Sequence, residues 1–189
     1  TMKNLFCVQD RVIVITGATG VLGRPMVLHF AEQGARVVFM GRRTEAGLAL
    51  QREASRGAGS AEFIACDVLD KTQIEAAYDR IMERYGRIDV LINGAGGNMP
   101  GATIAPDETI FDLKTDALHG VVDLNLFGTV MPTLAFARAM TEARSGSIIN
   151  IASESALRPL SRVAGYGVAK AAVVNFTRYL CGALARKYG

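Results

Sequence analysis

The glycine spacing near the N-terminus constrains the fold of this chain most strongly. Gly17, Gly20 and Gly23 follow the apolar run 12–15 and precede a helical pattern. A glycine turn between a buried strand and a helix lets a pyrophosphate approach the backbone and rest on the helix N-terminus. A plain strand-to-helix turn without a ligand is the alternative. We expect a dinucleotide site that includes Gly17, Thr19, Gly20, Val21, Leu22 and Gly23.

Short apolar runs alternate with helical patterns along the whole chain. Such runs predict strands that are buried on both faces, and right-handed crossovers make their sheet parallel. The predicted strands cover residues 12–15, 37–40, 63–66, 88–92 and 147–152. The fold class is therefore α/β, a Rossmann-type doubly wound parallel sheet flanked by helices. Residues 1–189 are predicted to form a single dinucleotide-binding domain with strand order 3-2-1-4-5.

This strand order places the run 147–152 at an edge of the sheet. An apolar edge strand exposes unpaired backbone groups that invite association. A complete fold of this kind has another strand after the helix that carries Lys170, where this sequence ends. We expect a domain that lacks its C-terminal strand or strands, because the sequence is a fragment or because a partner completes the sheet.

Glycine, proline and capping residues predict where the helices begin and end. Pro25 stands near the start of one helix and Gly34 at its end, while Asp70 is a candidate N-cap and Gly86 closes the helix that it begins. Residues 94–110 form an irregular stretch of the kind that carries sites. The helical pattern over 117–144 should kink or break within its length, because it contains Gly120, Gly128 and Pro132.

Composition points to small-molecule chemistry. The chain of 189 residues has 21 basic and 18 acidic side chains that are interspersed, with a net charge of +3. This balance gives no reason to expect a nucleic-acid surface or a basic membrane patch. Cys7, Cys66 and Cys181 are odd in number and lack metal-ligand spacing, so we expect no metal site and a reducing, cytoplasmic location. No apolar run suggests a membrane span.

Tyr166 and Lys170 form the strongest catalytic pattern. Positions i and i+4 share one face of a helix, so a phenol and an ammonium would face one pocket. A nearby cation favours the ionised phenol, which suits proton transfer. Ser153 ends the preceding predicted strand and would join them. A tyrosine–lysine pair on a solvated helix face is the alternative interpretation.

Two arginines indicate which dinucleotide is preferred. A site for NAD usually has an acidic residue at the end of the second strand, which binds the ribose 2′-hydroxyl. Here that place holds Gly41, Arg42 and Arg43. Because two guanidinium groups can pair with a 2′-phosphate, we expect NADP(H) to be preferred over NAD(H). Arg24 could add charge, and a solvated helix start is the alternative role of Arg42 and Arg43.

These residues together resemble the short-chain dehydrogenase/reductase family, classical type, from about Leu5 to Gly189. Residues 93–96 are similar to the motif that follows the family's fourth strand, and Asp67 stands where its members contact adenine. The resemblance implies an oxidoreductase of class EC 1.1.1 that acts on a carbonyl compound or an alcohol. It also implies a homodimer or homotetramer. The cofactor residues that it adds are Asp67, Val68, Asn93, Gly94, Ala95, Gly96, Tyr166 and Lys170.

The resemblance also assigns catalytic roles. Tyr166 would exchange a proton with the substrate oxygen, and Ser153 would orient that oxygen by a hydrogen bond. Lys170 would bind the nicotinamide ribose and favour the ionised form of Tyr166, and Asn125 would hold a water that links Lys170 to solvent. One subgroup, the D-mannonate oxidoreductases or fructuronate reductases, is similar over residues 96–100, 123–129, 149–153 and 171–177. This similarity suggests a sugar acid as substrate.

Two departures from the family pattern leave other functions open. Val21 stands where classical members have glycine, and Gly94 replaces the second asparagine of their motif. The glycine spacing also occurs in the extended branch, so a nucleotide-sugar epimerase or dehydratase is one alternative, although it would need a larger C-terminal domain. A non-catalytic NADP-binding sensor or structural subunit is the other. The sequence does not specify the substrate or the direction of the reaction in the cell.

Overall fold

A parallel sheet of five strands forms the centre of the molecule. The structure is a computed structural model, and it describes residues 6–188. The strands follow the order β3-β2-β1-β4-β5, and every neighbouring pair is parallel. The predicted fold class and strand order are confirmed. The strands are β1 (Val12–Thr16), β2 (Arg36–Gly41), β3 (Ser60–Ala65), β4 (Val90–Asn93) and β5 (Ser147–Asn150).

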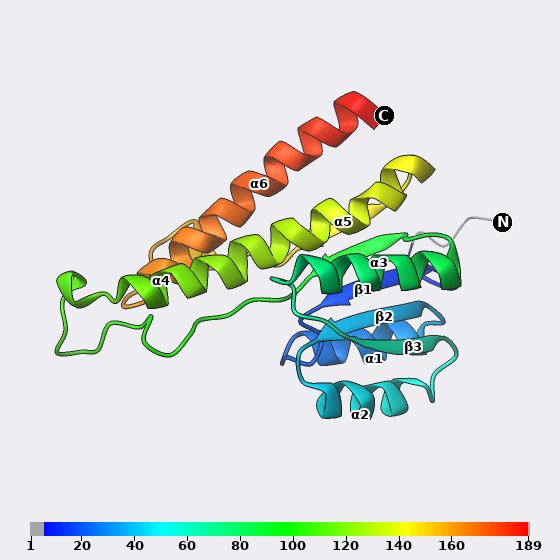
Figure 1. The fold of residues 1–189 in the computed structure, drawn as a ribbon, viewed down its shortest axis with the longest axis horizontal. Coiled ribbons are helices and arrows are strands. Elements are labelled where there is room, and N and C mark those ends of the chain that lie inside the picture. Colours follow the sequence, from blue (N-terminus) through cyan, green and yellow to red (C-terminus); the bar gives the residue numbers. More distant parts are fainter. Residues whose placement is uncertain (1–5, 189) are drawn as a thin grey trace.

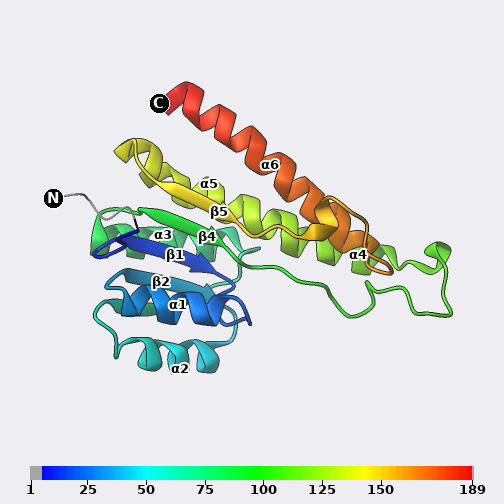
Figure 2. The same ribbon diagram turned by 180° about the vertical axis from the view of Figure 1, so that it is seen from behind.

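Helices cover both faces of this sheet (Figures 1 and 2). The alternation of strand side chains divides the core, because Val12 and Val14 of β1 face α3 and α5 while Ile13 and Ile15 face α1 and α2. The helix α6 lies beside α5. The helices are α1 (Gly23–Glu32), α2 (Thr44–Ala54), α3 (Lys71–Tyr85), α4 (Thr115–Val122), α5 (Gly128–Ala143) and α6 (Ala164–Tyr188), with short turns η1 (Ile110–Asp112) and η3 (Glu154–Ala156).

The predicted ends of α1 and α3 are confirmed. Pro25 lies in the first turn of α1, and Gly34, at φ +84°, follows its C-cap. The Asp70 carboxylate accepts hydrogen bonds from two backbone N–H groups at the start of α3. Gly86 ends the same helix in the left-handed conformation at φ +67°.

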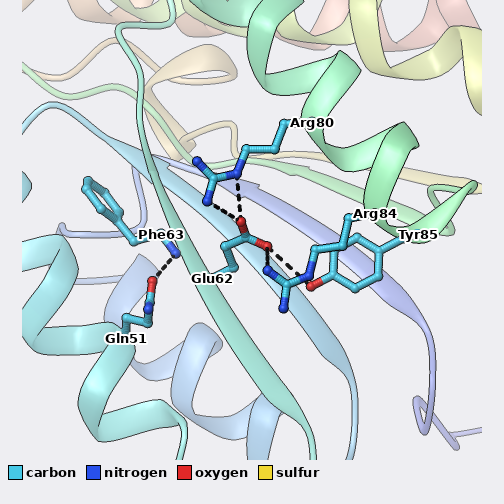
Figure 3. Close-up of polar contacts among 6 residues, drawn as sticks. All are labelled: Gln51, Glu62, Phe63, Arg80, Arg84 and Tyr85. Atoms are coloured by element: carbon cyan, nitrogen blue, oxygen red, sulfur yellow. Dashed lines mark hydrogen bonds and ion pairs between the residues drawn. The ribbon is translucent and has the colours of Figure 1, made fainter.

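Side chains from both flanking helices cover the edge strand β3 (Figure 3). Gln51 of α2 accepts a hydrogen bond from the Phe63 N–H at 2.7 Å. The nearly buried Glu62 carboxylate pairs with Arg80 and Arg84 of α3 at 2.6 and 2.8 Å. These contacts satisfy an edge N–H and attach α3 to the strand, which protects this edge of the sheet from further pairing.

The predicted interruption of the helical pattern over 117–144 is confirmed, and it lies between Gly120 and Gly128. A π-helical turn, η2 (Asp123–Phe127), joins α4 to α5, and Pro132 lies inside α5 without ending it. The Asn125 side chain donates to the Val121 carbonyl at 2.8 Å. That carbonyl would otherwise accept the backbone N–H of Asn125, so the side chain competes with the regular helix bond. The asparagine side chain therefore takes part in the π-helical turn, which ends at Gly128.

Two predictions about the strands need correction. Residue 66 lies outside β3, residues 88 and 89 lie outside β4, and residues 151 and 152 lie outside β5. The strand β5 is not buried on both faces, since Ile149 is 45% exposed, as expected at an edge.

The prediction that no apolar run suggests a membrane span also needs correction. The helical stretch 115–143 is long and apolar enough to cross a membrane by length and composition, although 50% of its most apolar window is buried inside the protein. Burial of this kind is typical of a core helix.

Candidate functional site

A pocket of about 260 Å³ opens at the carboxyl ends of the strands, where α/β sheets bind their ligands. It lies between the glycine turn, the end of β2, the segment after β3 and the segment after β4. Its lining residues are Gly17, Thr19, Gly20, Gly41, Arg42, Arg43, Cys66, Asp67, Val68, Ala95, Gly96 and Leu124. A larger cavity of about 410 Å³ lies along β5 and α6, and no predicted site residue lines it.

The glycine turn is packed too closely for side chains. A Cβ on Gly17, at φ +67°, would lie 2.6 Å from the Ala95 backbone, and one on Gly23 would lie 2.4 Å from Ala18 Cα. The N-cap of α1, Leu22, makes no side-chain capping bond, so its side chain does not satisfy the free N–H groups at the start of the helix. A cradle of backbone beside an uncapped helix N-terminus fits the pyrophosphate of a dinucleotide.

The turn residues do not all line the pocket. Val21 is 92% exposed and Leu22 is 63% exposed, and Gly23 packs against Ala18 instead. Gly23 thus allows the close approach of the helix to the strand, and the two apolar side chains project from the turn. Sequence reasoning missed Gly41, Cys66 and Leu124 as lining residues. Gly41 and Cys66 could have been found from the sequence, because each lies at or just after the end of a predicted strand.

The three arginines near the pocket have different partners. Arg42 is largely exposed and lies 3.9 Å from the Asp67 carboxylate across the pocket. Arg43 donates to the Thr19 carbonyl at 2.6 Å, which attaches it to the glycine turn. Arg24 forms an ion pair with Glu53 at 2.6 Å and does not line the pocket. Positive charge at the pocket therefore comes from Arg42 and Arg43.

The motif after β4 has an inner and an outer part. Asn93 is buried and donates to Thr133 and Asn150, both at 2.8 Å, so it connects β4 to α5 and β5. Its amide oxygen has no partner among the described residues. The Gly94 and Ala95 N–H groups donate to the Thr16 hydroxyl at 3.2 Å. Only the outer residues of the motif, Ala95 and Gly96, line the pocket.

Asn125 holds the backbone that follows this motif. Its side-chain oxygen accepts from the Gly97 N–H at 3.0 Å, and its nitrogen donates to the Gly97 carbonyl at 2.8 Å. The nitrogen also donates to Val121, so both amide hydrogens are used within the protein. A Cβ on Gly96 would lie 2.6 Å from the Asn125 oxygen and 3.2 Å from Lys170 Nζ. Asn125 and Lys170 thus meet at the inner side of Gly96.

Tyr166, Lys170 and Ser153 come together from α6 and η3. Lys170 Nζ donates to the Ile151 carbonyl at 2.7 Å and lies 5.6 Å from the centroid of the Tyr166 ring. Lys170 is 3% exposed, and its burial lowers the pKa of the ammonium. Ser153 precedes η3, and its hydroxyl accepts the N–H of Ser155. The predicted catalytic residues therefore surround the end of β5 and the first turn of α6.

The irregular stretch after β4 reaches the segment before Tyr166. The Ile104 N–H donates to the Arg162 carbonyl at 2.9 Å, and the Arg162 side chain donates back to the Ile104 carbonyl at 2.5 Å. Two segments far apart in the sequence are thereby joined near the start of α6. Within residues 6–188, no group of three His, Cys, Asp or Glu side chains is placed to hold a metal ion.

The sequence over residues 11–188 matches the pattern of the short chain dehydrogenases. This chain belongs to the short-chain dehydrogenase family. Among the similar curated proteins is the uncharacterized oxidoreductase UxuB of Bacillus subtilis, 35% identical over 175 residues, which cover 88% of this chain and 63% of that protein. An uncharacterized oxidoreductase of Haemophilus influenzae is 34% identical over 182 residues, which cover 91% of this chain and 64% of that protein. This short-chain dehydrogenase chain thus spans just under two thirds of these relatives.

Solved structures of the family have the same fold. One, from Haemophilus influenza and provisionally assigned as a D-mannonate oxidoreductase, contains bound NAD. It superposes with a TM-score of 0.88 at 33% identity, over 95% of this chain and 68% of that chain. A metagenomic short-chain oxidoreductase in complex with NADP gives a TM-score of 0.85 at 29% identity, over 95% of this chain and 79% of that chain. The first structure agrees with the subgroup that the sequence resembles.

Proposed function

We propose that this short-chain dehydrogenase is an oxidoreductase that uses a nicotinamide dinucleotide and acts on a ketone or secondary alcohol. The observation that carries the proposal is the position of Lys170. Its Nζ reaches the inner side of Gly96, which lines the pocket beside the glycine turn, while Tyr166 stands one turn earlier on the same helix. The helix α6 therefore presents a cation and a phenol at the pocket's edge.

Each catalytic residue has a distinct task in this proposal. When bound, the nicotinamide supplies or accepts the hydride. The Tyr166 hydroxyl gives a proton to the substrate oxygen in reduction and takes one in oxidation. Ser153 hydrogen-bonds the same oxygen, and the Lys170 ammonium binds the nicotinamide ribose. Asn125 fixes the Gly97 backbone beside Lys170, and a water that links this cation to solvent stays a prediction.

The preferred cofactor in our proposal is NADP(H). No carboxylate ends β2, and Arg42 and Arg43 line the pocket where the ribose 2′-position would lie. Asp67 stands 3.9 Å from Arg42 and would face the adenine side. Similar structures contain NAD in one case and NADP in another, so the arginines are the deciding feature. A bidentate guanidinium–phosphate pair is among the stronger charge-assisted contacts.

Cofactor titration followed by fluorescence tests this preference. We expect NADPH to bind at least tenfold more tightly than NADH, and Arg42→Ala to weaken NADPH by about tenfold while NADH changes less than threefold. Arg24→Ala is a matched control, because Arg24 lies outside the pocket and pairs with Glu53. Equal losses for both cofactors in the Arg42 variant would contradict the assignment.

A sugar acid is our proposed substrate. The support is the similarity to the structure provisionally assigned as a D-mannonate oxidoreductase, together with the matching residue strings. Oxidation of D-mannonate, followed by the absorbance of the reduced cofactor, tests the substrate class. Turnover of a steroid or a polyol without turnover of D-mannonate would overturn the sugar-acid assignment and keep the oxidoreductase.

Assembly and location are also proposals. Exposed apolar side chains on α5 and α6, including Leu134, Val168 and Tyr179, suit contacts in a homodimer or homotetramer. Light scattering of the purified protein measures the oligomeric state, and a monomer at micromolar concentration would contradict the proposed assembly.

The location that we propose is the cytoplasm. Cys7, Cys66 and Cys181 are free thiols, which suits this reducing compartment. We also propose that these residues form one dinucleotide-binding domain.

A further inference from the structure

The hydroxyl of Ser155 contacts the hydroxyl of the candidate catalytic serine. Ser155 Oγ lies 2.9 Å from Ser153 Oγ, and the Ser155 N–H donates to the same oxygen at 3.2 Å. Ser155 is only 5% exposed. Its backbone carbonyl lies 3.2 Å from the position that a Cβ on Gly167 would take. Ser155 is therefore packed between Ser153 and the first turn of α6, where Tyr166 stands.

The hydrogen-bonding capacity of a serine hydroxyl limits what Ser153 can do. A hydroxyl has one hydrogen to donate and two lone pairs that accept. If the Ser155 N–H and O–H groups both donate to Ser153 Oγ, its two lone pairs are occupied. The hydrogen of Ser153 then remains for a third partner, and the partner that a reductase offers is the substrate oxygen.

The opposite direction would leave the substrate oxygen without a hydrogen bond from Ser153, and only Tyr166 would donate to it. If Ser153 donated its hydrogen to Ser155, a substrate carbonyl, which accepts only, would meet lone pairs on Ser153. A chain that runs from Ser155 to Ser153 to the substrate lets every hydroxyl donate once. Hydrogen bonds in such a chain also polarise one another, which strengthens the last bond in the chain.

We propose that Ser155 is a positioning residue whose hydroxyl makes Ser153 a hydrogen-bond donor toward the substrate oxygen. This inference rests on the proposed oxidoreductase function. Ser155 itself does not touch the reacting atoms. The local alternative is that Ser155 merely stabilises the η3 turn, in which the bond from its N–H to Ser153 is a common turn contact.

Crystal structures of the wild type and of Ser155→Ala give a readout that does not depend on activity. In the wild type, Ser153 should occupy one χ1 rotamer with its oxygen beside Ser155 Oγ. In the variant the backbone N–H remains but the hydroxyl is gone, so Ser153 should populate at least two rotamers. A single, unchanged rotamer in the variant would overturn the proposal.

Turnover of D-mannonate, and of 2,3-butanedione with NADPH, gives the second readout. Ser155→Ala should lower kcat about 3–10-fold, the usual effect of losing one hydrogen bond, with a smaller change in KM and unchanged cofactor affinity. In a Ser153→Ala background the same change should alter kcat less than twofold, because the residue that it positions is absent. Equal losses in both backgrounds would show that Ser155 acts independently of Ser153.

A neighbouring variant separates positioning from turn stability. Glu154 lies in the same η3 turn and pairs with Arg158 at 2.6 Å, and it contacts neither serine hydroxyl. Glu154→Ala should loosen the turn and keep kcat within twofold of the wild type. A loss equal to that of Ser155→Ala would assign the effect to the turn and overturn the proposal. If the wild type converts neither probe, the sugar-acid assignment fails, while the rotamer comparison still decides whether the Ser155 hydroxyl positions Ser153.

Discussion

Lys170 Nζ lies 5.6 Å from the centroid of the Tyr166 ring, one turn further along α6. The same nitrogen donates to the Ile151 carbonyl at 2.7 Å, just beyond the end of β5. The hydrogen bond fixes the ammonium between the helix and the sheet. Lys170 is almost fully buried, and this burial lowers the pKa of its ammonium.

Tyr166→Phe should abolish most of the catalysis and leave cofactor binding nearly intact. The change removes the hydroxyl that exchanges the proton in the proposed reaction, and general acid–base catalysis contributes about 10²–10⁴-fold to a rate. We therefore expect kcat to fall at least 100-fold and the NADPH dissociation constant to change less than threefold. Initial rates and fluorescence titration measure the two quantities. A variant that retains its rate would rule out Tyr166 as the acid and base.

Gly96→Ala should damage the site by steric displacement. The new methyl group would meet the Asn125 oxygen at 2.6 Å, and that side chain cannot move because it is hydrogen-bonded to the Gly97 backbone and to Val121. We expect kcat to fall at least tenfold, since misplacement of about 1 Å near reacting groups is costly.

Gly97→Ala is the matched control for this change. Gly97 has a similar positive φ, +143° against +153°, but a Cβ there meets nothing within 4 Å. Both variants share the backbone strain, and only the first has the clash. Steady-state kinetics should therefore show a much smaller loss for Gly97→Ala. Equal losses would assign the effect to backbone strain alone.

Asp89 should make the free energy of unfolding depend on pH in the acidic range. Burial alone would raise the pKa of its carboxyl, but hydrogen bonds from the Val12 N–H, Arg87 and Arg11 outweigh burial and lower the pKa. Because the pKa of Asp89 is lower in the folded state, the ionised carboxylate stabilises the fold at pH values above about 4, its ordinary pKa in the unfolded chain. This stabilisation is lost as the pH falls through the pKa of the folded state.

Asp89→Asn should thus cost about 1–3 kcal/mol in the free energy of unfolding at pH 7, where charged hydrogen bonds are lost. The difference from the wild type should shrink as the pH falls below about 4. Urea denaturation at pH 7 and at pH 3 measures both values. A difference that does not depend on pH would mean that the charge of Asp89 contributes nothing.

Cys66 should react far more slowly with alkylating reagents than the other cysteines. Burial, with smaller contributions from the charges of Asp67 and Asp70, raises the pKa of its thiol to about 11. Cys7 and Cys181 are exposed. Because the thiolate is the reactive form, iodoacetamide at pH 8 should modify Cys7 and Cys181 first. Mass spectrometry after timed quenching identifies the modified residues, and early labelling of Cys66 would contradict its burial.

Local patterns were enough to predict the fold class and strand order. Apolar runs that alternate with helices admit few arrangements, and the glycine turn specifies which strand begins the fold. The ends of α1 and α3 also followed from their capping residues, because Asp70 and Gly86 act on atoms within a few positions of themselves. These features depend on contacts that are close in the sequence.

The π-helical turn at Asn125 could not be predicted in this way. The sequence offers Gly120, Gly128 and Pro132 as helix breakers, but the π-helical turn also contains Asn125, whose side chain binds Gly97, 28 positions away. Similarly, the exposure of Ile149 depends on its place at the edge of the sheet. Helix and strand propensities describe the backbone preference of a single residue. The π-helical turn and the exposure of Ile149 depend instead on contacts with segments that are distant in the sequence.

The sequence by itself determined the chemistry that this chain can contain: a glycine turn, two arginines after the second strand, and a serine, tyrosine and lysine at matched spacing. Only the tertiary structure decided which groups meet. It pairs Arg24 with Glu53 away from the pocket, brings Lys170 to Gly96, and places Ser155 against Ser153. The physical reason is that hydrogen bonds and ion pairs act over a few ångströms, and packing alone brings residues from different segments within that range.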